Sequence, residues 1–275
     1  PWSIGFPGWH LECSAMSTKY LGEQFDIHGG GMDLQATHHT NEIAQNIAYC
    51  GKSPANFWMH TNMLTVNGQK MSKSLGNSFL PMELFTGNHP LLTKGFSPMA
   101  VRFFMMQTHY RSTLDFSNEA LTASEKAYTR LMDSYKTLQT LKASTTSSED
   151  IAALERECYN AMNDDFNTPV LIANLFDAIR IINSANDKKA SLTQADIDLL
   201  NKIYQHFVFD VMGLKKEEET GKANTALEGV MQLVLDLRNK AKANKDFATS
   251  DEIRNKLTDA NIQIKDTKEG TTWSI

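Results

Sequence analysis

The pattern of apolar and polar residues divides the chain into a mixed first part and a helical second part. Between residues 99 and 207, apolar residues recur three or four positions apart, the spacing that places them on one face of an α-helix. The clearest stripe follows Ser117, a residue type that often caps a helix N-terminus, and Ser124 is a small polar break within it. The stripe consists of Leu121, Tyr128, Leu131, Tyr135 and Leu138.

Further helices are expected before and after this stripe. The run that begins at Met99 is apolar on most sides and should be buried. A later helix begins at Pro169, with Asn167 or Thr168 as its cap, because proline fits the first turn of a helix. These helices cover about residues 99–110, 151–162, 168–182 and 192–207. Amphipathic helices with short links predict an antiparallel bundle.

The first hundred residues mix helix and strand patterns. A helix is expected over Leu11–Leu21, a short strand over Phe25–His28 and a second helix over Thr37–Ala48. Residues 57–71 are typical of two short strands joined by Asn67-Gly68, a strong hairpin signal. The glycine triplet Gly29, Gly30 and Gly31 suits either a tight turn or the close approach of another group to the backbone.

The last sixty residues differ again in composition. Residues 215–226 are charged and poor in apolar side chains, which is typical of a linker. A helix after them has Val230, Leu233 and Leu237 on one face, and a hairpin is expected around Thr267–Gly270. Arg238, Lys240, Lys242 and Lys245 form a small basic cluster. The predicted domains are residues 1–112, 113–214 and 227–275.

Composition narrows the class of protein. The chain has 27 Lys and Arg residues against 32 Asp and Glu, a formal net charge of −5, so it is no generic basic nucleic-acid binder. No apolar run approaches the roughly 18 residues of a membrane span. Three cysteines are too few for a disulfide framework and favour a reducing, cytoplasmic location. The chain begins with Pro1 in what reads as mid-domain sequence, so a fragment is expected.

The stretch from residue 8 to residue 45 holds candidate metal ligands. It offers a thiol at Cys13, an imidazole at His38 and a carboxylate at Glu42. His38 and Glu42 are four residues apart, so on a helix they point from one face, and zinc accepts all three donor types. The same residues are also compatible with a small buried cysteine and an ordinary surface helix.

Several longer motifs identify a family resemblance. Residues 67–77 read NGQKMSKSLGN, and residues 70–74, KMSKS, are the signature loop of class I aminoacyl-tRNA synthetases. Together with GWHLECSAM, HGGGMDLQATHHTNEIAQ, NDDFNTP and the tail NIQIKDTKEGTTW, this makes the whole chain resemble cysteinyl-tRNA synthetases. The resemblance implies the second half of a Rossmann-like catalytic domain, then an antiparallel helical bundle and a small mixed α+β domain. It implies an α/β plus all-α fold.

The resemblance also implies roles for particular residues. Cys13, His38 and Glu42 correspond to zinc ligands, with one Zn²⁺ per subunit. Trp9 corresponds to an aromatic wall beside the cysteine side chain. The resemblance places Gly29, Gly30 and Asp33 against the adenylate. In the KMSKS loop, Lys73 would contact ATP, bound with Mg²⁺, and Lys70 would support the loop.

The implied reaction joins L-cysteine to tRNA(Cys) through cysteinyl-AMP, with zinc separating the thiol of cysteine from the hydroxyl of serine. The implied C-terminal end recognises the tRNA anticodon, and we expect a monomer without a membrane partner. Two features of the family have no counterpart here: the His-Ile-Gly-His type motif (often His-Ile-Gly-Asn) and a first zinc cysteine within Cys-Gly-Pro-Thr. We therefore expect the chain to be inactive alone and to hold zinc weakly.

Two other functions share some of these sequence features. A related ligase joins cysteine to an amino sugar in mycothiol synthesis, but it has no need of the C-terminal tail present here. A non-catalytic RNA-binding module has no need of the KMSKS lysines or of the three metal donors. Both alternatives are therefore less consistent with the sequence than the synthetase.

Overall fold

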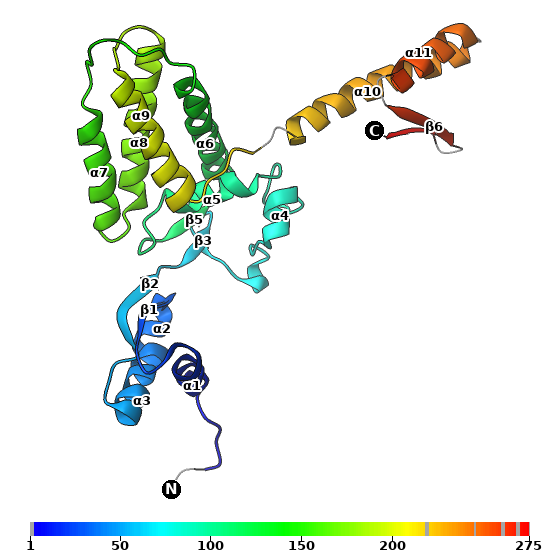
Figure 1. Cartoon of the computed structure of the whole chain (residues 1–275). Coiled ribbons are helices and arrows are strands. Elements are labelled where there is room, and N and C mark those ends of the chain that lie inside the picture. Colours follow the sequence, from blue (N-terminus) through cyan, green and yellow to red (C-terminus); the bar gives the residue numbers. More distant parts are fainter. Residues whose placement is uncertain (1–2, 218–219, 245, 260–261, 268–269, 275) are drawn as a thin grey trace. The chain divides into compact units, whose positions relative to one another are not determined.

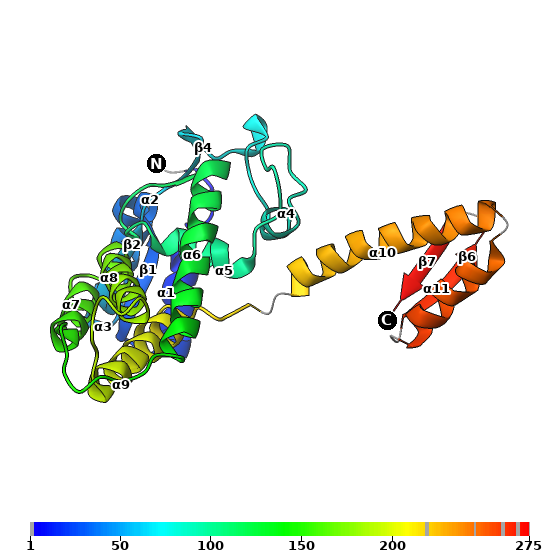
Figure 2. The same ribbon diagram turned by 90° about the horizontal axis from the view of Figure 1, so that it is seen from above.

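A computed structural model describes residues 3–217, 220–244, 246–259, 262–267 and 270–274 (Figures 1 and 2). The chain forms two compact units, Pro1–Lys215 and Lys216–Ile275, and each is described by itself. Among the described helices, none combines the length and the apolar character that crossing a membrane requires.

The first part of the larger unit is a small α/β layer. Helix α1 (His10–Leu21) packs against helix α3 (Thr40–Cys50) beside two parallel strands, β1 (Phe25–Gly31) and β2 (Ala55–Thr61). Between β1 and α3 the chain makes the short helix α2 (Met32–Leu34) and a π-helical turn, η1 (Gln35–His39). Strand β1 extends through the glycine triplet, beyond the predicted end of the strand at His28. None of its three glycines has a positive φ. A tight turn at these glycines is therefore excluded, and any need for glycine here must come from a group that lies close to the backbone.

A second sheet carries the hairpin. Strand β3 (Leu64–Val66) pairs antiparallel with β4 (Gln69–Lys70) and parallel with β5 (Leu114–Phe116). Asn67 and Gly68 join β3 to β4 with φ values of 51° and 73°, as the predicted two-residue turn requires. The expectation of only two strands over residues 57–71 was wrong, because residues 57–61 belong to β2 and pair with β1 instead. Beyond β4 lie a 3₁₀ turn, η2 (Lys73–Leu75), and helix α4 (Pro81–Thr86).

The helical bundle follows the predicted stripes. Its helices are α5 (Pro98–Met106), α6 (Asn118–Leu138), α7 (Ile151–Asn163), α8 (Thr168–Asn186) and α9 (Gln194–Ile203), which continues as the π-helical turn η3 (Tyr204–Val211). Helix α8 packs against both α6 and α7, so one continuous core runs through the bundle (Figure 1). Ser117 and Asn167 cap α6 and α8, each accepting a backbone N–H three residues on. The buried Ser124 donates to the carbonyl of Ala100, which satisfies the polar break in the stripe of α6.

The corner between α7 and α8 is tied to the segment that precedes β5. Asp165 and Phe166 both have positive φ, 53° and 55°, a conformation that non-glycine residues rarely adopt. The Asp165 carboxylate accepts hydrogen bonds from the hydroxyl of Tyr110 at 2.7 Å and from the guanidinium of Arg111 at 2.9 Å. These two hydrogen bonds anchor the strained corner.

The smaller unit consists of helices α10 (Thr220–Ala243) and α11 (Phe247–Asp259) and an antiparallel hairpin of β6 (Gln263–Thr267) and β7 (Gly270–Ser274). Residues 220–226 of the predicted linker are thus helical. The face with Val230, Leu233 and Leu237 is exposed, whereas Met231 and Leu235 are buried. The predicted basic cluster is not one surface, because Arg238 is buried; Lys245 and hairpin residues 268–269 lie outside the described residues.

Candidate metal centre

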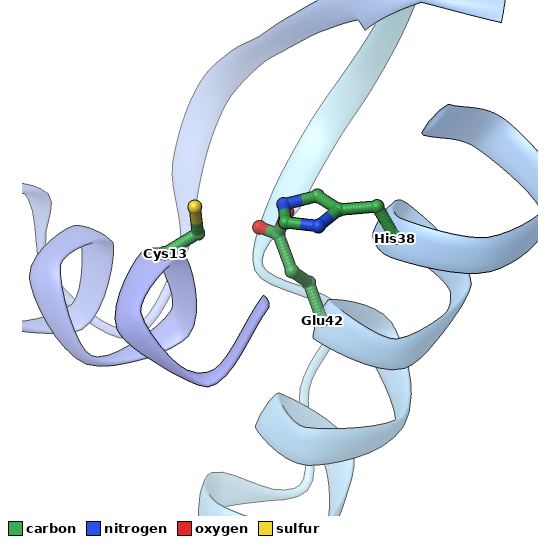
Figure 3. A group of neighbouring side chains, drawn as sticks. All are labelled: Cys13, His38 and Glu42. Atoms are coloured by element: carbon green, nitrogen blue, oxygen red, sulfur yellow. The ribbon is translucent and has the colours of Figure 1, made fainter. Parts of the chain in front are cut away.

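Three side chains predicted as metal ligands meet at the junction of α1, η1 and α3. Cys13 projects from α1, His38 from η1 and Glu42 from the first turn of α3 (Figure 3). One ligand atom of each lies within 4.8 Å of the others. Because η1 continues directly into α3, His38 and Glu42 stay on one face, and the packing of α1 against α3 supplies the thiol.

The carboxylate of Glu42 is buried without a hydrogen bond. Its side chain is 0 % exposed, and His38 Nε2 lies 2.9 Å from Oε1. That contact is an ion pair only when His38 is protonated, and neither carboxylate oxygen makes a hydrogen bond. His38 Nδ1 is likewise buried without a hydrogen-bond partner. Such atoms cost free energy unless another group satisfies them.

Burial shifts the pKa of each of the three candidate ligands in the direction that favours its uncharged form. It raises the pKa of Glu42 to about 7 and lowers that of His38, to which His10 also contributes. Burial, followed by the charges of Glu42 and Glu12, raises the pKa of the Cys13 thiol. A divalent cation would reverse these preferences for the thiol and the carboxyl group, because it stabilises their anions. A thiol, an imidazole and a buried carboxylate that makes no hydrogen bond fit Zn²⁺.

Trp9 forms one wall of this group. Its ring centroid lies 3.7 Å from that of His38 with the planes 33° apart, while the side chain is 57 % exposed. It thus contacts a candidate ligand on one side and remains accessible on the other.

Sequence reasoning missed a cluster of histidines around the same carboxylate. Five of the eight histidines of the chain lie here, in successive ring contacts: His10, His28, His38, His39 and His60. His28, His39 and Glu42 form a second group whose ligand atoms lie within 4.8 Å of one another. The density of histidine between residues 28 and 60 was the available signal, but His28 and His60 lie on paired strands whose pairing the sequence did not reveal.

The glycine triplet lies under this cluster. A β-carbon at residue 30 would stand 2.7 Å from His39 Cε1, so only glycine lets the imidazole lie on the strand. Gly29 is exposed, and a β-carbon there would make only an ordinary contact at 3.6 Å. Asp33, the other residue expected at the adenylate, is exposed in α2. Close packing of His39 thus accounts for Gly30, whereas Gly29 and Asp33 are accessible to a ligand.

The KMSKS loop presents both of its lysines to solvent. Lys70 ends β4 and Lys73 opens η2, and both are exposed. The loop is held from below by the buried Asn77, which accepts from the amide of Ser72 at 2.8 Å and donates to the carbonyl of Lys70 at 3.1 Å. Among the described residues, no hydrogen bond, ion pair or ring contact joins either lysine to the metal-ligand group. The structure therefore brings Trp9 together with the three candidate ligands but leaves the lysines apart.

Comparisons with known proteins agree in assigning one family to the chain. Residues 1–126 match the profile of the tRNA synthetases class I (C) catalytic domain, and residues 157–215 match the DALR domain. A cysteine–tRNA ligase of Parabacteroides distasonis is 53 % identical over 276 residues, which cover 100 % of this chain and 56 % of the relative. One of Bacteroides thetaiotaomicron is 52 % identical over 278 residues, with the same shares covered. The chain thus spans about half the length of these relatives.

A solved LeuRS–tRNA–LeuAMS complex of Agrobacterium radiobacter is more distant. Its TM-score is 0.49 and its sequence identity 18 %, over 65 % of this chain and 25 % of that one.

Proposed function

The chain belongs to the cysteine–tRNA ligase family of class I aminoacyl-tRNA synthetases, and we propose that it serves the ATP-dependent ligation of cysteine to tRNA(Cys). The observation that carries the proposal is the group of half-buried Cys13 with buried His38 and Glu42, whose carboxylate makes no hydrogen bond. An RNA-binding module without catalysis has no use for such a group, since burying it costs stability.

We assign the selection of cysteine to this group. Cys13 as thiolate and Glu42 as carboxylate supply two negative charges, and His38 adds a neutral nitrogen, so the site matches a divalent ion in charge and donor type. Bound zinc would supply an electrophile that prefers the sulfur of cysteine to the hydroxyl of serine. Trp9 covers His38 and offers its exposed face to the substrate side chain. Apolar contacts alone would distinguish cysteine from serine by only about 1–3 kcal/mol.

We assign the activation of cysteine by ATP to two other surfaces. Gly29, Gly30 and Asp33 would lie against the adenylate, supported by the exposure of Gly29 and Asp33. Lys73 would stabilise charge that develops on the phosphates of Mg²⁺-bound ATP, and Lys70 would support the loop. The loop suits this role, because its backbone is held by hydrogen bonds while its lysine side chains are exposed and free to contact a bound ligand.

The helical bundle and the smaller unit would bind tRNA. The bundle contains the DALR match, and the smaller unit would recognise the anticodon. Zinc takes four ligands and this group offers three, and the chain spans 56 % of the length of its relatives. We therefore propose that it is inactive by itself and binds zinc more weakly than its full-length relatives.

The decisive experiment is charging of a cysteine tRNA with labelled cysteine. The chain is assayed alone and joined to the remaining part of a relative, and ATP–pyrophosphate exchange is followed in parallel. Charging by the joined protein supports the proposal, and its loss in His38→Ala supports the role of the ligand group. Activation of cysteine without charging favours the amino-sugar ligase instead. Full activity of the chain alone overturns the predicted inactivity.

A further inference from the structure

The two oxygens of the Glu42 carboxylate face two different histidines. Oε1 lies 2.9 Å from Nε2 of His38, one of the candidate metal ligands. Oε2 lies 3.5 Å from Nε2 of His28, a residue with no role in the proposed function so far. Neither pair makes a hydrogen bond of good geometry in this structure, so both oxygens are available.

The ring of His28 is held in place by its neighbours. It lies on β1 with 17 % of its side chain exposed. Its ring centroid is 4.7 Å from that of Trp58 and 4.8 Å from that of His39, which it meets nearly edge-on at 82°. Phe25 packs against it at 5.5 Å. With three aromatic contacts, the ring is fixed beside the carboxylate, and a shift of about half an ångström would bring Nε2 to hydrogen-bonding distance.

We propose that His28 is a positioning residue for the metal ligand Glu42. Neutral His28 with a proton on Nε2 donates to Oε2, which fixes the plane of the carboxylate and directs Oε1 toward the ion beside His38 and Cys13. This inference rests on the proposed metal centre. Ligating carboxylates are commonly hydrogen-bonded by such outer residues, and removal of one typically costs about 10- to 100-fold in metal affinity.

The alternative is that His28 binds a second ion with His39 and Glu42, since their ligand atoms also lie within 4.8 Å of one another. The hydrogen bond of 2.8 Å between His39 Nδ1 and His60 Nε2 leaves Nε2 of His39 open to a ligand, so it does not decide between the two roles. The charge balance opposes a second ion, because two divalent ions would bring four positive charges against the two anions Cys13 and Glu42 in a largely buried site.

The test measures metal affinity directly, by titrating the metal-free chain with Zn²⁺ or Co²⁺ in competition with a chromogenic chelator. His28→Phe keeps the aromatic packing and removes the donor, whereas His28→Gln keeps a donor. His206→Ala, in the bundle, is the matched control. We expect one ion per chain, a loss of about 10- to 100-fold in affinity for His28→Phe, and values within about threefold of the unchanged chain for His28→Gln and His206→Ala. The Co²⁺–thiolate absorption of Cys13 should persist in all of them.

Three results contradict the inference. Equal affinity of His28→Phe and the unchanged chain excludes the positioning role. Two ions per chain, one of which is lost in both His28→Phe and His39→Phe, makes His28 a ligand instead. Absence of metal binding by the unchanged chain overturns the metal centre itself and this role with it. Circular dichroism of each variant shows whether a loss reflects unfolding, and a folded His28→Gln that binds no better than His28→Phe also contradicts the proposal.

Discussion

The imidazole of His39 rests on the backbone of Gly30, where a β-carbon would stand 2.7 Å from Cε1. Residue 30 also pairs with His60 on the neighbouring strand, and His60 hydrogen-bonds to His39. Gly30 thus lies against His39 and pairs with His60, the two histidines on one side of the cluster that surrounds Glu42.

Gly30→Ala should therefore destabilise the first part of the chain. The added methyl group must displace His39, and overpacking of this kind costs about 1–3 kcal/mol. Gly29→Ala is the matched control, because its β-carbon meets only the Met59 carbonyl at 3.6 Å. Alanine also lowers the conformational entropy of the unfolded chain, so the stability of this variant should be unchanged or slightly higher. Urea denaturation of both variants measures the difference, and equal stabilities would show that the close approach is unimportant.

The three cysteines should react differently with an alkylating reagent. Cys158 is buried in the bundle, and burial raises its pKa to about 12, so it should stay unlabelled in the folded chain. Cys13 should be labelled in metal-free protein and protected by added zinc. Cys50, which donates to the carbonyl of Asn46, serves as the internal control whose labelling zinc does not change. Mass spectrometry locates the labels, and zinc-independent labelling of Cys13 argues against its role as a ligand.

Lys73→Ala should impair the activation of cysteine rather than its binding. Loss of one group that stabilises transition-state charge typically lowers kcat by on the order of 10²–10³-fold. The measurement is ATP–pyrophosphate exchange by the chain joined to the rest of a relative, with Lys52→Ala as a surface control. An effect confined to the Michaelis constant for cysteine would remove Lys73 from the ATP site.

Asp165→Asn should destabilise the chain at neutral pH but not in acid. The hydrogen bond from Tyr110, followed by that from Arg111, lowers the pKa of Asp165 below its usual value of 3.8. The carboxylate therefore adds stability above about pH 3.8, and this contribution is lost as the pH falls through the lower pKa of the folded state.

Thermal unfolding from pH 7 to pH 2 tests this prediction. The gap between the unchanged chain and Asp165→Asn should close in acid. Asp164→Asn, whose carboxylate accepts from the side chain of Asn167 instead, is the control. A gap that stays constant with pH would mean that the ionised form of Asp165 adds no stability.

Much of the fold was accessible from local sequence patterns. The stripe of α6, its cap at Ser117 and the turn at Asn67-Gly68 are confirmed, because each depends on residues close together in the chain. The class I catalytic domain and the helical domain, expected from the resemblance, are confirmed by the profile matches. The strand pairing was missed, because β2 resembles any short apolar strand and its partner β1 lies about thirty residues earlier.

The candidate site could be predicted from the sequence only in part, because it also depends on contacts between distant segments. The spacing of His38 and Glu42 predicts a shared helix face, but the approach of Cys13 depends on the packing of α1 against α3. His28 reaches Glu42 from a strand, a relationship that no local spacing encodes. Arg238 was expected in a basic surface cluster, and its burial depends on how α10 packs within the smaller unit.

The segment that leads into β5 is a mechanical support shared by two parts of the larger unit. Near its start it holds the α7–α8 corner through Asp165, and at its end Asp115 accepts from the amide of Gly68, two residues before Lys70. The same short stretch of chain is therefore hydrogen-bonded both to the corner of the bundle and to the hairpin that begins the KMSKS loop. A substitution in this stretch can thus alter the support of both parts at once.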